Sequence, residues 1–69
     1  MKLYYYPETD SLYIDLNPKP GVDTVEVSEG VFVDLDEQGK PVGIDIDHAS
    51  ERLDLTSVEM VDLPLTLPA

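Results

Sequence analysis

The chain has 69 residues, 15 of them acidic and four basic, and a formal net charge of −11. This length allows one domain, and so few cations exclude a protein that holds nucleic acid directly by its phosphates. The chain contains no cysteine and no apolar run as long as a membrane span. We therefore expect a cytoplasmic protein that has no disulfides and does not bind membranes.

Apolar and polar residues alternate with a period of two through the first two thirds of the chain, as in strands with one buried face. Five strands are predicted, at residues 3–5, 12–16, 22–27, 31–35 and 42–46. Gly39 supplies a positive φ for the turn before the fifth strand. Because the connections are short, the strands are expected to form an antiparallel meander in which each pairs with the next.

The rest of the chain predicts little regular structure. A short helix is expected over residues 47–53, with Asp47 near its N-cap. Thr56 and Glu59 have the spacing of a capping box, which predicts a second helical turn that ends before Pro64. The fold class is therefore α+β: a meander of four to five strands followed by one or two short helices that pack on its apolar face.

The domain organisation is a single unit over residues 1–69, with the meander and first helix in 1–53 and an apolar, proline-containing tail in 54–69. The tail segment at residues 63–68 suits an edge strand, a strap or an arm that reaches a second subunit. A core this small is marginal without disulfides or a thiolate metal site, and self-association is the usual remedy. We therefore predict a homodimer. Apolar tail residues are available to cover the sheet: Val58, Met60, Val61, Leu63, Leu65 and Leu67.

Three motifs occur in a fixed order along the chain. They are Tyr5-x-Pro7-Glu8-x-Asp10-x-Leu12-Tyr13-Ile14, Val33-Asp34-x-Asp36-x-x-Gly39-x-x-Val42-Gly43-Ile44-Asp45-Ile46 and Ala49-Ser50-x-x-Leu53. This order resembles the small bacterial family known as domain of unknown function 2283, over about residues 1–53. The sequence departs from the family at Asp45, where Glu is expected, and at His48, where Asn is more usual. Some family members are encoded near small toxin-like proteins, so the resemblance implies an antitoxin-like or other partner-binding role.

The polar face of the predicted sheet holds the candidate binding residues. If Val33 pairs with Ile44, then Asp34 and Asp45 are diagonal neighbours about 7 Å apart. Acidic faces attract basic proteins by charge complementarity. We therefore interpret the chain as an acidic protein-interaction domain, an antitoxin-like or regulatory partner of a basic protein. The candidate partner-binding residues are Tyr13, Asp15, Asp34 and Asp45.

Two alternatives from other classes remain open. Asp34, Asp36 and Asp45 have part of the spacing of a calcium loop, but the flanks alternate as strands where an EF-hand needs helices. The same carboxylates suit a hydrolytic site, although a flat sheet supplies no deep pocket. We therefore expect no enzymatic activity, no metal and no cofactor, and keep the metal-binding or hydrolytic protein as the alternative. The other alternative is an acidic DNA mimic, which needs regular rows of carboxylates.

Overall fold

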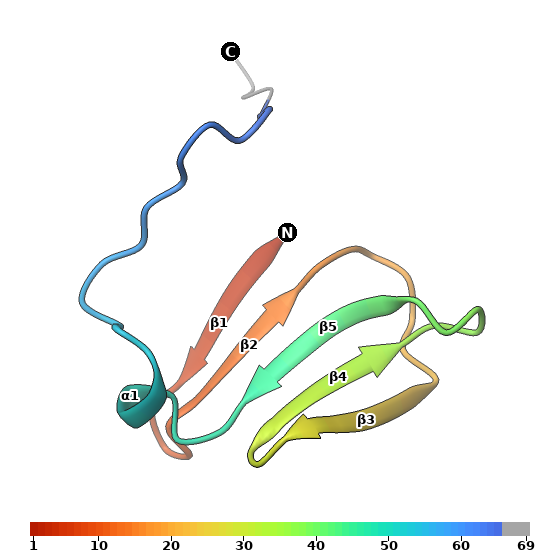
Figure 1. Cartoon of the computed structure of the whole chain (residues 1–69), viewed down its shortest axis with the longest axis horizontal. Coiled ribbons are helices and arrows are strands. Elements are labelled where there is room, and N and C mark those ends of the chain that lie inside the picture. The colour runs from red at the N-terminus through yellow and green to blue at the C-terminus, as the bar shows by residue number, and fades with distance from the viewer. Residues whose placement is uncertain (66–69) are drawn as a thin grey trace.

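The computed structural model describes residues 1–65 and contains five strands and one short helix (Figure 1). The elements are β1 Lys2–Tyr6, β2 Ser11–Asp15, β3 Asp23–Ser28, β4 Val31–Leu35, β5 Pro41–Ile46 and α1 Ala49–Arg52. The five predicted strands are therefore confirmed: β4 has its predicted bounds, and the other four differ from theirs by one residue at one or both ends. The turn before β5 contains Gly39 at φ 75°, as the sequence predicts.

The strand order in the sheet is β1-β2-β5-β4-β3, with every neighbouring pair antiparallel. The prediction of a simple meander is wrong at one place, because β2 pairs with β5 and not with β3. The seven residues between β2 and β3 can reach about 23 Å when extended, and the three strand spacings they cross measure about 14 Å. Pro18 and Pro20 stiffen this link, so it crosses the end of the sheet instead of forming a tight turn.

The predicted register between β4 and β5 is confirmed. Val33 pairs with Ile44, and on the opposite face Asp34 pairs with Gly43. The register shifts between Asp34 and Leu35, which leaves Val42 as an extra residue of β5 at a β-bulge. Val42 is buried because the β2–β3 link, at Gly21, passes against this end of the sheet.

The apolar face of the sheet is largely uncovered. Only two apolar side chains within residues 1–65 are buried, Val42 and Ala49. Even Ile44, on the central strand, is only half-buried. Several apolar-face side chains of the outer strands are exposed, namely Leu3, Tyr5, Val25 and Val27. The expected packing of helices on this face is not confirmed, because α1 has one turn and lies at one end of the sheet (Figure 1).

The start of α1 differs from the prediction. The N-cap is His48 and not Asp47, and His48 adopts a left-handed conformation without a side-chain capping bond. The N–H of Ala49 instead donates to the backbone oxygen of Asp10, in the turn between β1 and β2. A long-range contact therefore takes the place of the local cap that the sequence predicts. No helix within residues 1–65 is long and apolar enough to cross a membrane.

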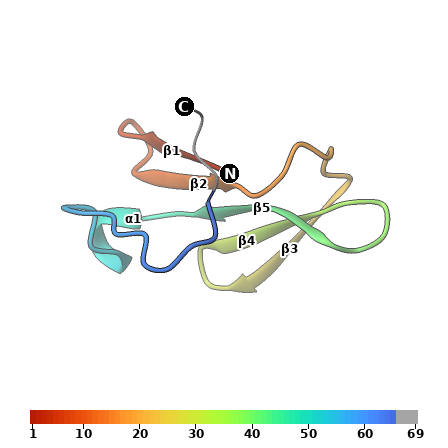
Figure 2. The same ribbon diagram turned by 90° about the horizontal axis from the view of Figure 1, so that it is seen from above.

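Residues 53–65, which follow α1, contain no helix. The predicted second turn fails because Asp54 accepts hydrogen bonds from both the N–H and the hydroxyl of Thr56, which forms a local turn in place of a capping box. Figure 1 shows this segment on the β1 side of the sheet, away from β3 and β4, and Figure 2 shows the twist of the sheet. Within residues 1–65 the predicted cover of the sheet is therefore not confirmed, and these tail side chains are exposed: Val58, Met60, Val61, Leu63 and Leu65. Leu67 and the end of the predicted 63–68 segment lie outside the described residues.

Candidate functional site

A hydrogen-bonded triad lies on the polar face of the sheet and joins three strands. The Tyr13 hydroxyl on β2 donates to Oδ2 of Asp34 on β4 over 2.8 Å. The Thr24 hydroxyl on β3 donates to Oδ1 of the same carboxylate over 2.6 Å. Both oxygens of Asp34 therefore accept a hydrogen bond, and the carboxylate ties the outer strand β3 to β2.

Tyr13 reaches Asp34 by crossing over β5, which lies between them. A Cβ built on Gly43 would be 1.9 Å from the Tyr13 hydroxyl oxygen, so only glycine leaves room for the ring at this point. The bond to Asp34, followed by burial and the negative charges of Asp34, Asp15 and Asp45, raises the pKa of Tyr13 to about 12. The phenol therefore stays protonated and remains a donor throughout the neutral range.

Asp45 differs from Asp34 although both lie on the same face. Within residues 1–65, no donor forms a hydrogen bond to the Asp45 carboxylate. Burial raises the pKa of Asp45, and the charges of Asp47 and Asp34 raise it further. A cation supplied from outside would therefore stabilise ionised Asp45.

These side chains surround a hollow of about 560 Å³ on the polar face. Its lining combines two carboxylates, three aromatic rings and three serine or threonine side chains, and contains no basic residue: Tyr6, Thr9, Ser11, Tyr13, Thr24, Phe32, Asp34 and Asp45. Three of the four predicted binding residues thus meet in one place, namely Tyr13, Asp34 and Asp45. The fourth, Asp15, lies on the same face opposite Lys2 and Gly43 and does not line the hollow.

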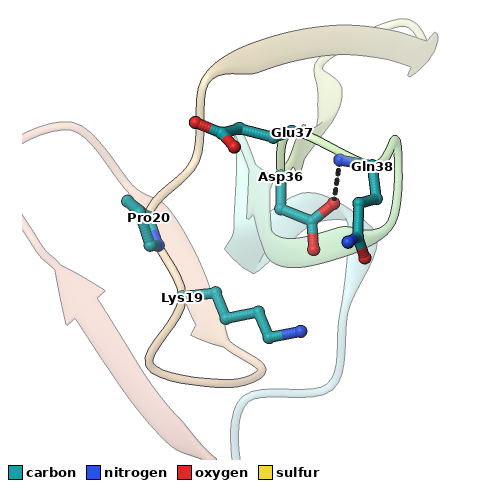
Figure 3. Close-up of a pocket in the computed structure, with 5 residues that line it drawn as sticks. All are labelled: Lys19, Pro20, Asp36, Glu37 and Gln38. Carbon is teal, nitrogen blue, oxygen red and sulfur yellow. Dashed lines mark hydrogen bonds between the residues drawn. The ribbon is translucent and has the colours of Figure 1, made fainter.

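Asp36 belongs to a different structure, the turn between β4 and β5. Its Oδ1 accepts the backbone N–H groups of Gln38 and Lys40, and these bonds, with the nearby charge of Lys19, lower the pKa of Asp36. Figure 3 shows this carboxylate beside Lys19 and Pro20, in a hollow of about 300 Å³ that Glu37 and Gln38 complete. The structure therefore explains Asp36 as the residue that closes the turn.

The metal alternative required Asp34, Asp36 and Asp45 to act together. Within residues 1–65, no three His, Cys, Asp or Glu side chains are placed to hold a metal ion. Asp34 is engaged by two hydroxyls, and Asp36 by two backbone N–H groups. The spacing that resembled a calcium loop is the spacing of a β-hairpin.

One functional-looking cluster was missed by reasoning from the sequence. Asp10, at φ 52°, accepts hydrogen bonds from the Tyr5 hydroxyl and from both the hydroxyl and the N–H of Ser50. The bond from the Ser50 hydroxyl, followed by that from Tyr5, lowers the pKa of Asp10. Asp10 thus fastens α1 to the turn between β1 and β2. The sequence did contain a signal for this cluster, because Tyr5, Asp10 and Ser50 lie in two of the three motifs that carry the family resemblance.

One of the comparisons with known proteins identifies a family. A family model described as Protein of unknown function (DUF2283) matches residues 2–50. No curated protein and no solved structure matches the chain. The matched range contains all five strands, the Asp10–Ser50 contact and the polar-face hollow, so the features of the site lie within the part that defines the family. The chain belongs to the protein family of unknown function DUF2283.

Proposed function

We propose that the protein is an interaction domain whose polar face binds a basic protein. The observation that carries this proposal is the hollow on that face, in which the Asp45 carboxylate has no hydrogen-bond donor from residues 1–65. A partially buried carboxylate of this kind gains from pairing with a cation. The lining of the hollow contains no basic side chain of its own, so the cation comes from a partner.

The chemistry of the lining favours an arginine or lysine side chain as the group that enters. Tyr6, Tyr13 and Phe32 offer aromatic faces near the two carboxylates. Aromatic faces attract cations, and arginine in particular stacks on them while it pairs with a carboxylate. This arrangement fits a neutralising or regulatory partner of a basic protein, which includes the antitoxin-like role implied by the family.

The polar face gives less support to a DNA mimic. Across β2, β5 and β4, the central row of this face reads Tyr13, Asp45 and Phe32, so aromatic rings separate the carboxylates. A mimic of the phosphate backbone needs regularly repeated charges, and this row does not supply them. The predicted homodimer also remains a proposal, and it leaves the polar face free if the copies join through the opposite face.

The proposal is tested by affinity capture from a native lysate with three baits: the wild-type chain, Asp45→Asn and Asp23→Asn. Asp23 pairs with Leu35 on the other face, so its variant removes the same charge at a matched control position. We expect the wild-type and Asp23→Asn baits to capture a basic protein. The association rate of that protein should be about tenfold lower on the Asp45→Asn bait. Added salt should lower the association rate on all three baits. Capture of a neutral or acidic protein, or equal rates on all baits, contradicts the proposal.

A further inference from the structure

The apolar face of the sheet consists of complete rows of apolar side chains. One row crosses all five strands through successive pairs: Leu3, Ile14, Ile44, Val33 and Val25. A second crosses four strands: Tyr5, Leu12, Ile46 and Val31. No side chain of these rows is fully buried. Exposed apolar surfaces of this extent mark interaction sites on proteins.

The exposed area of the chain is large enough to account for a stable interface. A folded monomer of this size exposes about 4,300 Å², whereas this chain exposes 5596 Å². The excess of about 1,300 Å² is greater than the roughly 800 Å² that each partner buries in a standard interface. The uncovered face and the exposed segment at 54–65 both contribute to this excess.

The distribution of charge leaves the apolar face as the surface through which a second copy can bind. Two chains with a net charge of −11 repel each other over most of their surfaces. The apolar rows contain no charged side chain, and Asp23 shares their face only at the edge strand β3. Contact through this face therefore keeps the carboxylates Asp34 and Asp45, on the opposite face, on the outside of the pair and far from each other.

We propose that two copies stack through their apolar sheet faces and form a sandwich of two five-stranded sheets. Packed sheets lie about 10 Å apart, and their inward side chains supply the core that one copy lacks. An apolar groove of about 660 Å³ lies at the rim of this face, between Leu3 and Leu12 of the sheet and Leu55 of the following segment. This inference rests on the proposed self-association and does not depend on a basic partner.

A first experiment measures the dissociation constant by analytical ultracentrifugation of the full chain over a dilution series. We compare Ile44→Lys with Asp45→Lys, which are adjacent on β5 but lie on opposite faces. Both substitutions reduce the net negative charge, so electrostatics favour the dimer in both. We expect at least a tenfold weakening for Ile44→Lys only, and tighter dimers at higher salt because salt screens the repulsion. Val25→Lys and Glu26→Lys on β3 repeat the comparison if the β5 variants do not fold.

A second experiment identifies the face directly and uses the absence of natural cysteines. Single-cysteine variants Ile44→Cys and Asp45→Cys are treated with a short bis-maleimide, which links cysteines across an interface. Efficient cross-linking of Ile44→Cys and little of Asp45→Cys supports the sandwich. A dimer that cross-links through Asp45→Cys overturns the stacking while leaving self-association intact. A monomer at every concentration overturns both, whether the face is covered by the chain's own tail or by another protein.

Discussion

The Tyr13 side chain lies directly over Gly43, where any other residue would place its Cβ within 1.9 Å of the Tyr13 hydroxyl oxygen. This contact allows a tyrosine on β2 to reach a carboxylate on β4 across the strand between them. Glycine is therefore needed at position 43 because the Tyr13 ring of the hydrogen-bonded triad must pass over it, more than because of the backbone conformation of β5.

The first prediction concerns this contact. Gly43→Ala is expected to lower the free energy of unfolding by about 1–3 kcal/mol, because the ring must move and Asp34 then loses its Tyr13 donor. Urea unfolding of the variant measures the loss. In a Tyr13→Ala background the ring is absent, so the additional cost of Gly43→Ala should largely disappear. An equal cost in both backgrounds contradicts the assignment.

The second prediction concerns the pH dependence of stability. The raised pKa of Asp45 means that its folded state binds a proton more readily than its unfolded state. Ionised Asp45 therefore opposes folding at neutral pH, and this penalty is relieved as the pH falls through the raised folded pKa. We expect the melting temperature to rise from pH 7 into the mildly acidic range. Asp45→Asn should remove that rise, and a wild-type profile without it contradicts the prediction.

At lower pH the opposite trend takes over. The pKa values of Asp10, Asp36 and Asp54 are lowered by hydrogen bonds to their ionised carboxylates. Their contributions to stability are present above the ordinary pKa of an aspartate, and are lost as the pH falls through the lowered folded values. The full profile should therefore have its maximum on the mildly acidic side and fall steeply in strong acid, as thermal unfolding across a pH series will show.

The third prediction concerns the attachment of α1. Asp10→Ala removes the acceptor of three hydrogen bonds, whereas Ser50→Ala leaves the Tyr5 and backbone bonds in place. We expect the loss of melting temperature to be larger for Asp10→Ala, intermediate for Ser50→Ala and negligible for Ser57→Ala in the exposed segment. Hydrogen exchange at the Ala49 amide, which is bonded to the Asp10 backbone oxygen, should accelerate in the same order.

A fourth prediction concerns divalent cations at the turn between β4 and β5. Because Oδ1 of Asp36 already accepts two backbone N–H groups, millimolar calcium or magnesium should leave the melting temperature unchanged. Asp36→Asn keeps an acceptor for the turn, whereas Asp36→Ala loses it, so Ala should destabilise the chain more than Asn. A saturable stabilisation by either cation that Asp36→Ala abolishes would restore the metal alternative.

Much of the local structure was determined by the sequence. The alternation of side chains predicted all five strands and the two faces, because the period of a strand is two. The Asp36–Lys40 turn fixed the register between β4 and β5, and the same register placed Asp34 and Asp45 on one face. These features depend on neighbours along the chain or across one hairpin, and such contacts can be inferred from spacing alone.

Only the tertiary structure decided the features that join distant segments. The pairing of β2 with β5, the path of Tyr13 over Gly43 and the bond from Ser50 to Asp10 each link residues that lie far apart in sequence. Tertiary contacts also make Asp34 and Asp45 different. Both oxygens of Asp34 accept hydrogen bonds, whereas Asp45 has no donor within the described residues. Such contacts cannot be predicted from spacing along the chain, because they depend on which strands become neighbours in the sheet. That order is set when the stiff β2–β3 link crosses the end of the sheet.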